Sequence, residues 1–346
     1  MGGVVDQVAA VAEEVLYPAA QGTDRAERVP EGHLRALASA GAFGVASTCT
    51  APERRQVHRL LGGACGATYF VWAQHDGPVR LLTASENEGL RARWLDRLLS
   101  GEIVGGTAFA HLRRPGPPLV WAEPDGDGWR LHGEAPWATG WGMAGVYSVG
   151  AVTPSGTVLW VLLPAERLTP TRPLELAVMQ ATATVRLRFD GTAVAPADVL
   201  LELDREKWGV VDTSIGNRGN PAVQGMTLRA LDLLAVTGDA GADVAATMRP
   251  ALDRVIGENE SLADAADDHE VDVPALAAAR AEAVDLAQRA SLALLTAVGG
   301  RGVELSHPAQ RLVREAAFYA IQGQTSAGRA AGLDRSRARA CARELS

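Results

Sequence analysis

The feature that most restricts the fold of this chain is a change of apolar spacing that occurs twice along its length. Up to about residue 103, apolar residues recur three and four positions apart, as on one face of a helix. Short runs of period two, separated by glycine and proline, then follow, and helical spacing returns near residue 204. We therefore predict an α+β multidomain chain with an α-helical N-terminal domain (1–103), a middle domain (104–203) that is a small β-barrel or sandwich, and an α-helical C-terminal four-helix bundle (204–346).

Local signals predict where several helices begin and end. The first helix should end near Pro18. It carries one apolar stripe, formed by Val4, Val8, Val11 and Val15. A second helix is predicted from Pro30, a favoured first-turn residue, to Gly41. Ser85 and Glu88 have the spacing of a capping box for a third helix. Residues 260–272 are rich in acidic side chains, which favours an exposed loop.

The stretch 126–142, GDGWRLHGEAPWATGWG, is the most informative part of the chain for function. Its first residues have the turn chemistry of a hairpin, which predicts strands on both sides. A second strand is predicted to follow Gly133, and Trp137 and Thr139 stand two apart on it, so they should share one face and offer an aromatic plate beside a hydroxyl donor. Such a pair suits a flat, hydrogen-bonding ring. The alternative is a buried tryptophan beside an ordinary strand threonine.

Composition restricts the classes of function. The chain has 346 residues, 47% of them hydrophobic, and a formal net charge of −8, which argues against a nucleic-acid surface. The chain has three cysteines, which are widely spaced and form no CxxC pair, so neither a disulfide framework nor a metal site is expected. No apolar run reaches the length of a membrane helix, and the N-terminus lacks the charge pattern of a signal peptide. We expect a cytoplasmic protein that binds no membrane.

A resemblance to a known family rests first on the hairpin motif. The pattern L-x-G-x-x-x-W-x-T-x-x-G resembles the middle-domain signature of acyl-CoA dehydrogenases, and is filled by Leu131, Gly133, Trp137, Thr139 and Gly142. In that family the tryptophan and the threonine line the flavin. The resemblance therefore implies an FAD cofactor, with Trp137 packed on the ring and Thr139 hydrogen-bonded to it.

Further family motifs recur in the same order along nearly the whole chain. Residues 29–45 look like the second helix of the family, and residues 185–200 resemble the end of its β-domain. Gly299 and Gly300 fall in a segment similar to the family's Q-x-x-G-G-x-G, where the glycine pair lets the backbone approach the partner subunit's cofactor. Thr325 matches the threonine of the family's I-x-E-G-T-S. The resemblance assigns these three residues to the cofactor, although Gly299 is equally suited to capping the preceding helix.

The departures from the family are as informative as the matches. Gly323, or Gln322 in a register shifted by one, stands where many members hold their catalytic glutamate, and Asn217 stands at the other known position of the base. None of these side chains can take a proton from a thioester α-carbon, so no catalytic residue is assigned. The flavin-cradling T-E-P-x-x-G-S-D is represented only by residues 112–118, whose arginines either meet phosphate or lie on a solvated loop.

Three hypotheses about the function lead, and a nonflavin enzyme that reuses the cavity also stays open. The leading one is a flavin-dependent oxidoreductase that acts on an acyl thioester of CoA or a carrier protein with divergent chemistry. The second is a flavin monooxygenase on the same fold, in which His75 in WAQHD has either a chemical or a structural role. The third is a non-catalytic subunit that completes the site of an active paralogue. The resemblance implies a homodimer, a homotetramer or a heteromer with a paralogue.

Overall fold

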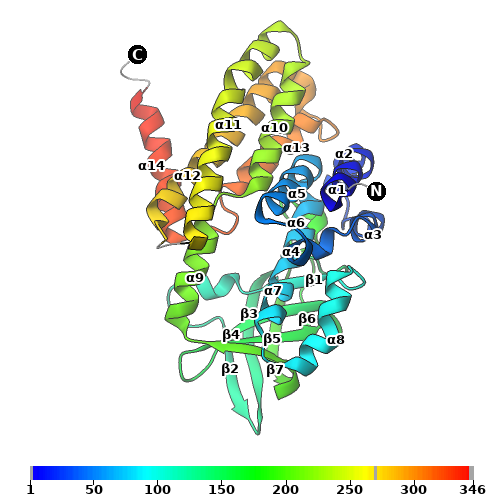
Figure 1. Cartoon of the computed structure of the whole chain (residues 1–346), viewed down its shortest axis with the longest axis vertical. Coiled ribbons are helices and arrows are strands. Elements are labelled where there is room, and N and C mark those ends of the chain that lie inside the picture. Colours follow the sequence, from blue (N-terminus) through cyan, green and yellow to red (C-terminus); the bar gives the residue numbers. More distant parts are fainter. Residues whose placement is uncertain (1–2, 269–270, 343–346) are drawn as a thin grey trace. The chain divides into compact units, whose positions relative to one another are not determined.

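The structure is a computed structural model that describes residues 3–268 and 271–342, and the chain divides into two compact units. The first unit contains residues 3–16, 23–57 and 67–209, and it combines helices with a sheet. The second contains residues 17–22, 58–66 and the described residues from 210 onward, and it is helical. Figure 1 labels the elements of both units.

Eight helices precede the sheet. They are α1 (Val4–Val11), α2 (Tyr17–Asp24), α3 (Glu31–Ser39), α4 (Val45–Thr48), α5 (Ala51–Ala64), α6 (Gly66–Gln74), α7 (Asp76–Ala84) and α8 (Glu88–Leu99). The predicted helix from Pro30 to Gly41 is confirmed as α3, which follows Pro30 and is ended by Gly41 at a φ of 73°. A left-handed φ of this kind is the usual reason for a glycine after a helix.

The prediction that the first helix ends at Pro18 is wrong. A π-helical turn over Ala12–Leu16 joins α1 to α2, so the helical segment continues through Pro18 to Asp24. The wider π turn also changes which residue faces the core. Leu16 is buried, whereas Val15, expected in the apolar stripe, is 37% exposed.

The predicted capping box on α8 is also wrong. Asn87 caps this helix, since its side-chain oxygen accepts a hydrogen bond from the amide of Leu90 at 3.0 Å. The hydroxyl of Ser85 instead accepts from the amide of Asn87 and donates to the carbonyl of Leu200. Asparagine caps a helix as well as serine does, and the sequence offered both residues two positions apart.

The middle of the chain forms one mixed sheet of eight strands. The strands are β1 (Gly105–Ala108), β2 (Val120–Asp125), β3 (Gly128–Ala138), β4 (Val146–Val152), β5 (Val158–Pro164), β6 (Thr169–Pro170), β7 (Val185–Val194) and β8 (Val199–Leu203). Their order is β6-β7-β3-β2-β4-β5-β8, with β1 parallel to β4. The predicted hairpin is confirmed, because Asp125 pairs with Gly128 across the β2–β3 turn.

Two apolar clusters pack against the sheet, one on each face. On one face, residues of several strands form one apolar cluster, with Leu131, Tyr147 and Leu187 among its buried members. The middle of the chain is thus a mixed sheet with an apolar interior, as expected for a β domain. On the other face α7 and α8 cover the strands, with Val79 and Leu98 packed in one cluster with Trp160.

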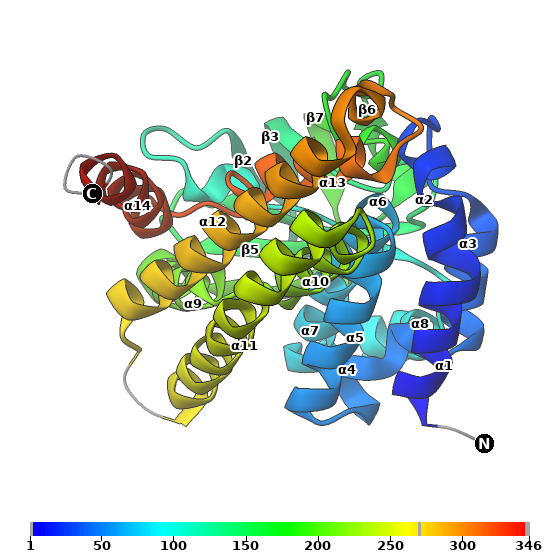
Figure 2. The same cartoon turned by 90° about the horizontal axis from the view of Figure 1, so that it is seen from above.

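The second unit is built mainly from the last six helices. They are α9 (Arg205–Asn217), which begins within the first unit, α10 (Pro221–Ala235), α11 (Asp239–Asp268), α12 (Val273–Val298), α13 (Pro308–Tyr319) and α14 (Ser326–Ala342). Figure 2 shows α10, α11 and α12 side by side, with α13 against α12. The predicted acidic loop 260–272 is wrong as far as residue 268, which belongs to α11, while 269–270 lie outside the described residues.

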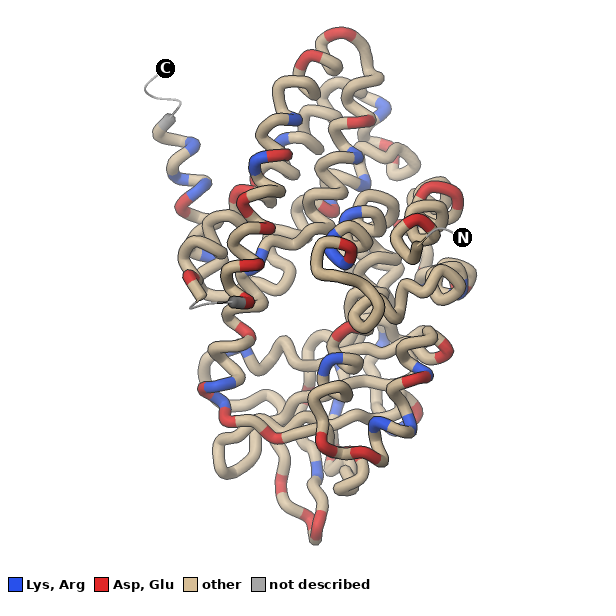
Figure 3. The backbone as a smooth tube through the Cα atoms, in the orientation of Figure 1, with Lys and Arg blue, Asp and Glu red and all other residues tan. Residues whose placement is uncertain are grey.

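Charged side chains attach α14 to α12. Arg335 pairs with Glu282 at 3.2 Å, and Arg339 pairs with Asp285 at 2.7 Å. Figure 3 shows the basic residues of α14 along the helix that leads to the C-terminal mark. Among the described residues, no helix is long and apolar enough to cross a membrane.

Candidate functional site

Trp137 and Thr139 lie at the end of β3 in the first unit. Between Ala135 and Ala138 the register with β7 shifts, because these residues oppose Leu187 and Val185. A bulge of this kind bends the strand and re-aims its side chains. Trp137 is 45% exposed, so it is not part of the core, whereas Thr139 is 6% exposed and follows the last residue of the strand. The prediction that both residues share one face of a strand that starts after Gly133 is wrong, because β3 runs through Gly133 and ends before the buried Thr139.

The backbone at Thr139 is held from two sides. The hydroxyl of Tyr147 donates to the carbonyl oxygen of Thr139 at 3.3 Å, and the amide of Gly140 donates to the carbonyl oxygen of Thr182 at 2.8 Å. Burial raises the pKa of Tyr147 well above its ordinary value, so this phenol remains a donor at any physiological pH. The exposed indole therefore stands next to a residue whose position is fixed.

The turn that meets Gly140 is strained. Met179 and Ala183 have φ angles of 61° and 46°, and they flank a short 3-10 helix, Gln180–Thr182. Only these two non-glycine residues have a positive φ in the described chain. Side chains rarely adopt this conformation, and such strain persists where surrounding contacts fix it, often at functional sites.

Three threonine hydroxyls connect this turn to Thr139. The Oγ1 atoms of Thr139 and Thr184 are 3.1 Å apart, and those of Thr184 and Thr182 are 2.8 Å apart. Thr182 Oγ1 donates to the carbonyl oxygen of Met179 at 2.7 Å. All three threonines are buried. The family resemblance pointed to Thr139 alone as a cofactor-binding threonine. The other two threonines stand two apart, at positions 182 and 184 ahead of β7, and this spacing was visible in the sequence.

A buried histidine directly precedes the segment that replaces the family's flavin cradle. His111 lies in a 3-10 turn, Ala110–Arg113, and its Nε2 is 2.8 Å from the carbonyl oxygen of Gly150. Burial lowers the pKa of His111 to about 4, so the imidazole is neutral at pH 7. Residues 114–118 are exposed, as the solvated-loop alternative requires, while Leu112 is part of the core. Nothing in the local sequence pattern pointed to His111.

His75 has the contacts of a structural residue. Its Nδ1 accepts a hydrogen bond from the amide of Gly105 at 3.0 Å, and its ring packs edge-on against Phe43. Burial lowers the pKa of His75 to about 4. An Nδ1 that accepts leaves the proton on Nε2, so one neutral tautomer is selected. These contacts favour the structural role.

Gly299 and Gly300 lie at the C-terminus of α12, in the second unit. The amide of Gly299 caps the helix on Leu295, and its φ of 68° with a ψ of −146° is accessible essentially to glycine alone. Both glycines are exposed, and no atom lies within 4 Å of the place where a Cβ would stand on either of them. Gly299 therefore caps α12, and the backbone of both glycines is accessible to a molecule that approaches it.

The two positions at which the family holds its base are linked within the second unit. Asn217 is fully buried, and its Oδ1 accepts from the hydroxyl of Thr325 at 2.7 Å. Arg280 donates to the carbonyl oxygens of Gly216 at 3.1 Å and of Gln322 at 2.6 Å. Asn217 Nδ2 also donates to the carbonyl oxygen of Thr213 at 2.7 Å, and the hydroxyl proton of the candidate cofactor residue Thr325 already has an acceptor.

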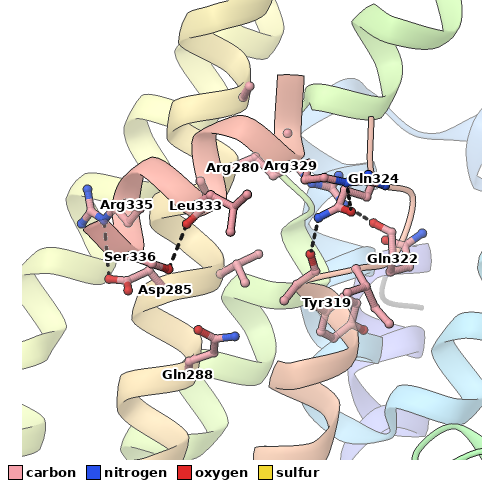
Figure 4. A pocket seen from close by; sticks show the side chains of 17 residues that line it. Arg280, Asp285, Gln288, Tyr319, Gln322, Gln324, Arg329, Leu333, Arg335 and Ser336 are labelled. Atoms are coloured by element: carbon pink, nitrogen blue, oxygen red, sulfur yellow. Dashed lines mark hydrogen bonds and ion pairs between the residues drawn. The ribbon is translucent and has the colours of Figure 1, made fainter. Parts of the chain in front are cut away.

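A cavity of about 290 Å³ lies beside this link, between α12, α14 and the loop that joins α13 to α14. Figure 4 shows that its polar side chains contact one another, including Arg329 with Gln324 and Arg335 with Asp285. Leu333 and Ile321 contribute apolar surface. The cavity contains no carboxylate other than Asp285, which pairs with arginines.

Comparisons with known proteins agree on the fold. No protein-family model and no curated protein sequence matches the chain. Solved structures do match over most of their length. A glutaryl-CoA dehydrogenase from Mycobacterium smegmatis in complex with FADH2 shares 17% identity at a TM-score of 0.82, with 93% of this chain and 90% of that one covered. The chain has the acyl-CoA dehydrogenase fold.

Other matches with this fold differ in their chemistry. The butyryl-CoA dehydrogenase from Megasphaera elsdenii shares 15% identity at a TM-score of 0.78, with 95% and 94% of the two chains covered. The dibenzothiophene monooxygenase from Paenibacillus sp. A11-2 shares 16% at a TM-score of 0.77, with 91% and 92% covered. The predicted fold class is thereby confirmed. Since these identities are low, the function has to be argued from the residues of the site.

Proposed function

We propose that this protein is an FAD-dependent oxidoreductase of the acyl-CoA dehydrogenase type. The observation that carries the proposal is the exposed indole of Trp137 beside Thr139, whose backbone is fixed by Tyr147 and by the strained turn. An isoalloxazine ring needs an aromatic or apolar surface and a few placed polar groups, and these residues fit it. When bound, FAD supplies a hydride acceptor. Gly299, Gly300 and Thr325 are also proposed as cofactor-binding residues.

The first test is flavin binding. The purified protein should show flavin absorbance, and Trp137→Ala should weaken FAD binding about 3- to 10-fold, because aromatic stacking contributes about 0.5–1.5 kcal/mol. Trp121→Ala is the matched control, since Trp121 lies on the same sheet with a similar exposure of 40%, stacked on His132. FAD titration measures both. An unchanged affinity in Trp137→Ala would remove Trp137 from the site.

The substrate of this proposal is an acyl thioester of CoA or a carrier protein, with chemistry that differs from simple dehydrogenation. Asn217 and Gly323 offer no base, and the carboxylate of Glu315 is buried in an ion pair with Arg311. The absence of a base favours one alternative, a flavin monooxygenase, because oxygen chemistry at a flavin needs no α-carbon base. The proposed assembly is a homodimer or homotetramer in the cytoplasm, or a heteromer with a paralogue.

Flavin reduction by simple acyl-CoAs tests the missing base. We expect butyryl-CoA and octanoyl-CoA to reduce the bound flavin slowly or not at all, because a general base contributes about 10²–10⁴-fold. Gly323→Glu should recover part of this factor if flavin and substrate are aligned. Gly323→Ala is its control, since it shares the backbone strain of a side chain at a φ of 60° without a carboxylate.

Two outcomes would contradict this expectation. Brisk reduction in the unmodified homomer would mean that another group is the base, and Asp212 would be the first carboxylate to replace. Activity that appears only on mixing with a homologous chain would favour a non-catalytic subunit that completes the site of a paralogue. Oxygen-dependent turnover without reduction by acyl-CoA would favour the monooxygenase.

A further inference from the structure

The hydrogen bonds of the three threonines have a single consistent direction. A threonine hydroxyl has one proton to donate and lone pairs to accept with. The acceptor of Thr182 is the carbonyl oxygen of Met179 at 2.7 Å, and a carbonyl can only accept. The hydroxyl proton of Thr182 is therefore already used.

The direction of the next two hydrogen bonds follows from the first. Thr182 Oγ1 can take part in its 2.8 Å contact with Thr184 only as the acceptor, so the proton of Thr184 points toward Thr182. Thr184 Oγ1 must then accept in its 3.1 Å contact with Thr139. The proton of Thr139 consequently points inward, along the chain Thr139 to Thr184 to Thr182 to Met179.

Rigid surroundings keep this direction fixed. Thr182 is fully buried and Thr184 is nearly so, so exchange with bulk water is blocked. The amide of Thr182 also donates to the carbonyl of Met179, which the left-handed conformation of Met179 presents to both groups. The strained turn thus holds the terminal acceptor of the chain in place.

We propose that Thr182 and Thr184 are positioning residues that keep the hydroxyl proton of Thr139 turned inward, so that Thr139 offers only lone pairs to the cofactor. This inference rests on the proposed flavin function. It reverses the donor role expected for Thr139 from the sequence. At N5 the oxidised isoalloxazine has a lone pair, whereas the reduced ring has an N–H that such an acceptor binds. The hydroxyl chain therefore favours the reduced cofactor.

A substitution outside contact with Thr139 tests the chain. In Thr182→Val the proton of Thr184 loses its acceptor and turns to Thr139, whose own proton is then released toward the cofactor. The preference for reduced over oxidised FAD should fall about tenfold, the effect of one hydrogen bond. For a two-electron couple this lowers the reduction potential by about 30 mV. Thr182→Ser keeps the hydroxyl and should keep the potential.

Two measurements distinguish this inference from the proposed function. A redox titration against a reference dye gives the potential, and an equal potential in wild type and Thr182→Val, or an equal fall in the Ser and Val variants, would overturn the hydroxyl chain. Proton NMR of the wild type without cofactor should show a slowly exchanging Thr139 hydroxyl close to Thr184. A rapidly exchanging hydroxyl would also overturn it. Absence of FAD binding in the wild type would refute only the proposed function.

Discussion

Replacing Glu315 with alanine is expected to lower the free energy of unfolding by about 3–5 kcal/mol, because it leaves a buried guanidinium without its counter-charge. Arg311 and Glu315 are both buried on α13, with Nη1 and Oε1 2.8 Å apart. Glu315 also accepts from the amide of Gly66 at 3.3 Å, and Arg311 donates to Gln21 at 3.1 Å. Chemical denaturation followed by circular dichroism measures the loss.

Two controls separate charge burial from the loss of packing. The double variant Arg311→Met with Glu315→Leu removes both charges and should be more stable than Glu315→Ala alone. Glu31→Ala breaks an exposed pair with Arg35 at the same helical spacing, and should cost no more than about 0.5 kcal/mol. A loss below 1 kcal/mol in Glu315→Ala would show that water or another group solvates Arg311.

The role of Glu315 in the fold also bears on catalysis. No local sequence pattern distinguishes Glu315 from a carboxylate that is available as a base. Glu315 is buried in an ion pair with Arg311, and a base that is fixed in an ion pair cannot move to a substrate. The proposed chemistry therefore depends on groups other than Glu315, Asn217 and Gly323.

The sequence predicted the fold well because apolar spacing is a property of whole elements. The β2–β3 hairpin and α3 were foreseen from turn and cap residues that act locally. The predicted helix end at Pro18 was wrong because a π-helical turn precedes this residue and the helix continues, and no propensity rule anticipates that turn. The limits of the three predicted domains stay predictions.

The candidate site was predicted only in part, because its supports are distant in sequence. Trp137 and Thr139 belong to a recognisable motif. Tyr147 and the strained turn at Met179 contribute through contacts that only the folded sheet creates. A left-handed methionine has no sequence signature, since glycine or asparagine is the residue expected there. The placement of Trp137 and Thr139 against a cofactor stays a prediction.

A fall in pH from 6.5 to 4 should destabilise the protein through His75 and His111. Folding holds the pKa of each at about 4, below the ordinary value of 6.5. Between these values the unfolded chain binds protons that the folded chain does not, so stability is present above pH 6.5 and is lost as the pH falls. One pKa unit corresponds to about 1.4 kcal/mol, so each histidine should cost on the order of 3 kcal/mol by pH 4.

Single variants assign this loss to individual rings. His111→Gln keeps an amide donor for the carbonyl of Gly150 but has no proton to gain. Its free energy of unfolding should therefore fall less steeply between pH 6.5 and 4 than that of the wild type. The two slopes should differ by about 1.4 kcal/mol per pH unit. His75→Gln should behave in the same way. Denaturation at several pH values measures the slopes, and parallel curves for variant and wild type would show that the rings are protonated within the fold. Because both rings are neutral at pH 7, neither is an imidazolium acid there, so a turnover that depends on a group of pKa near 6.5 must involve another residue.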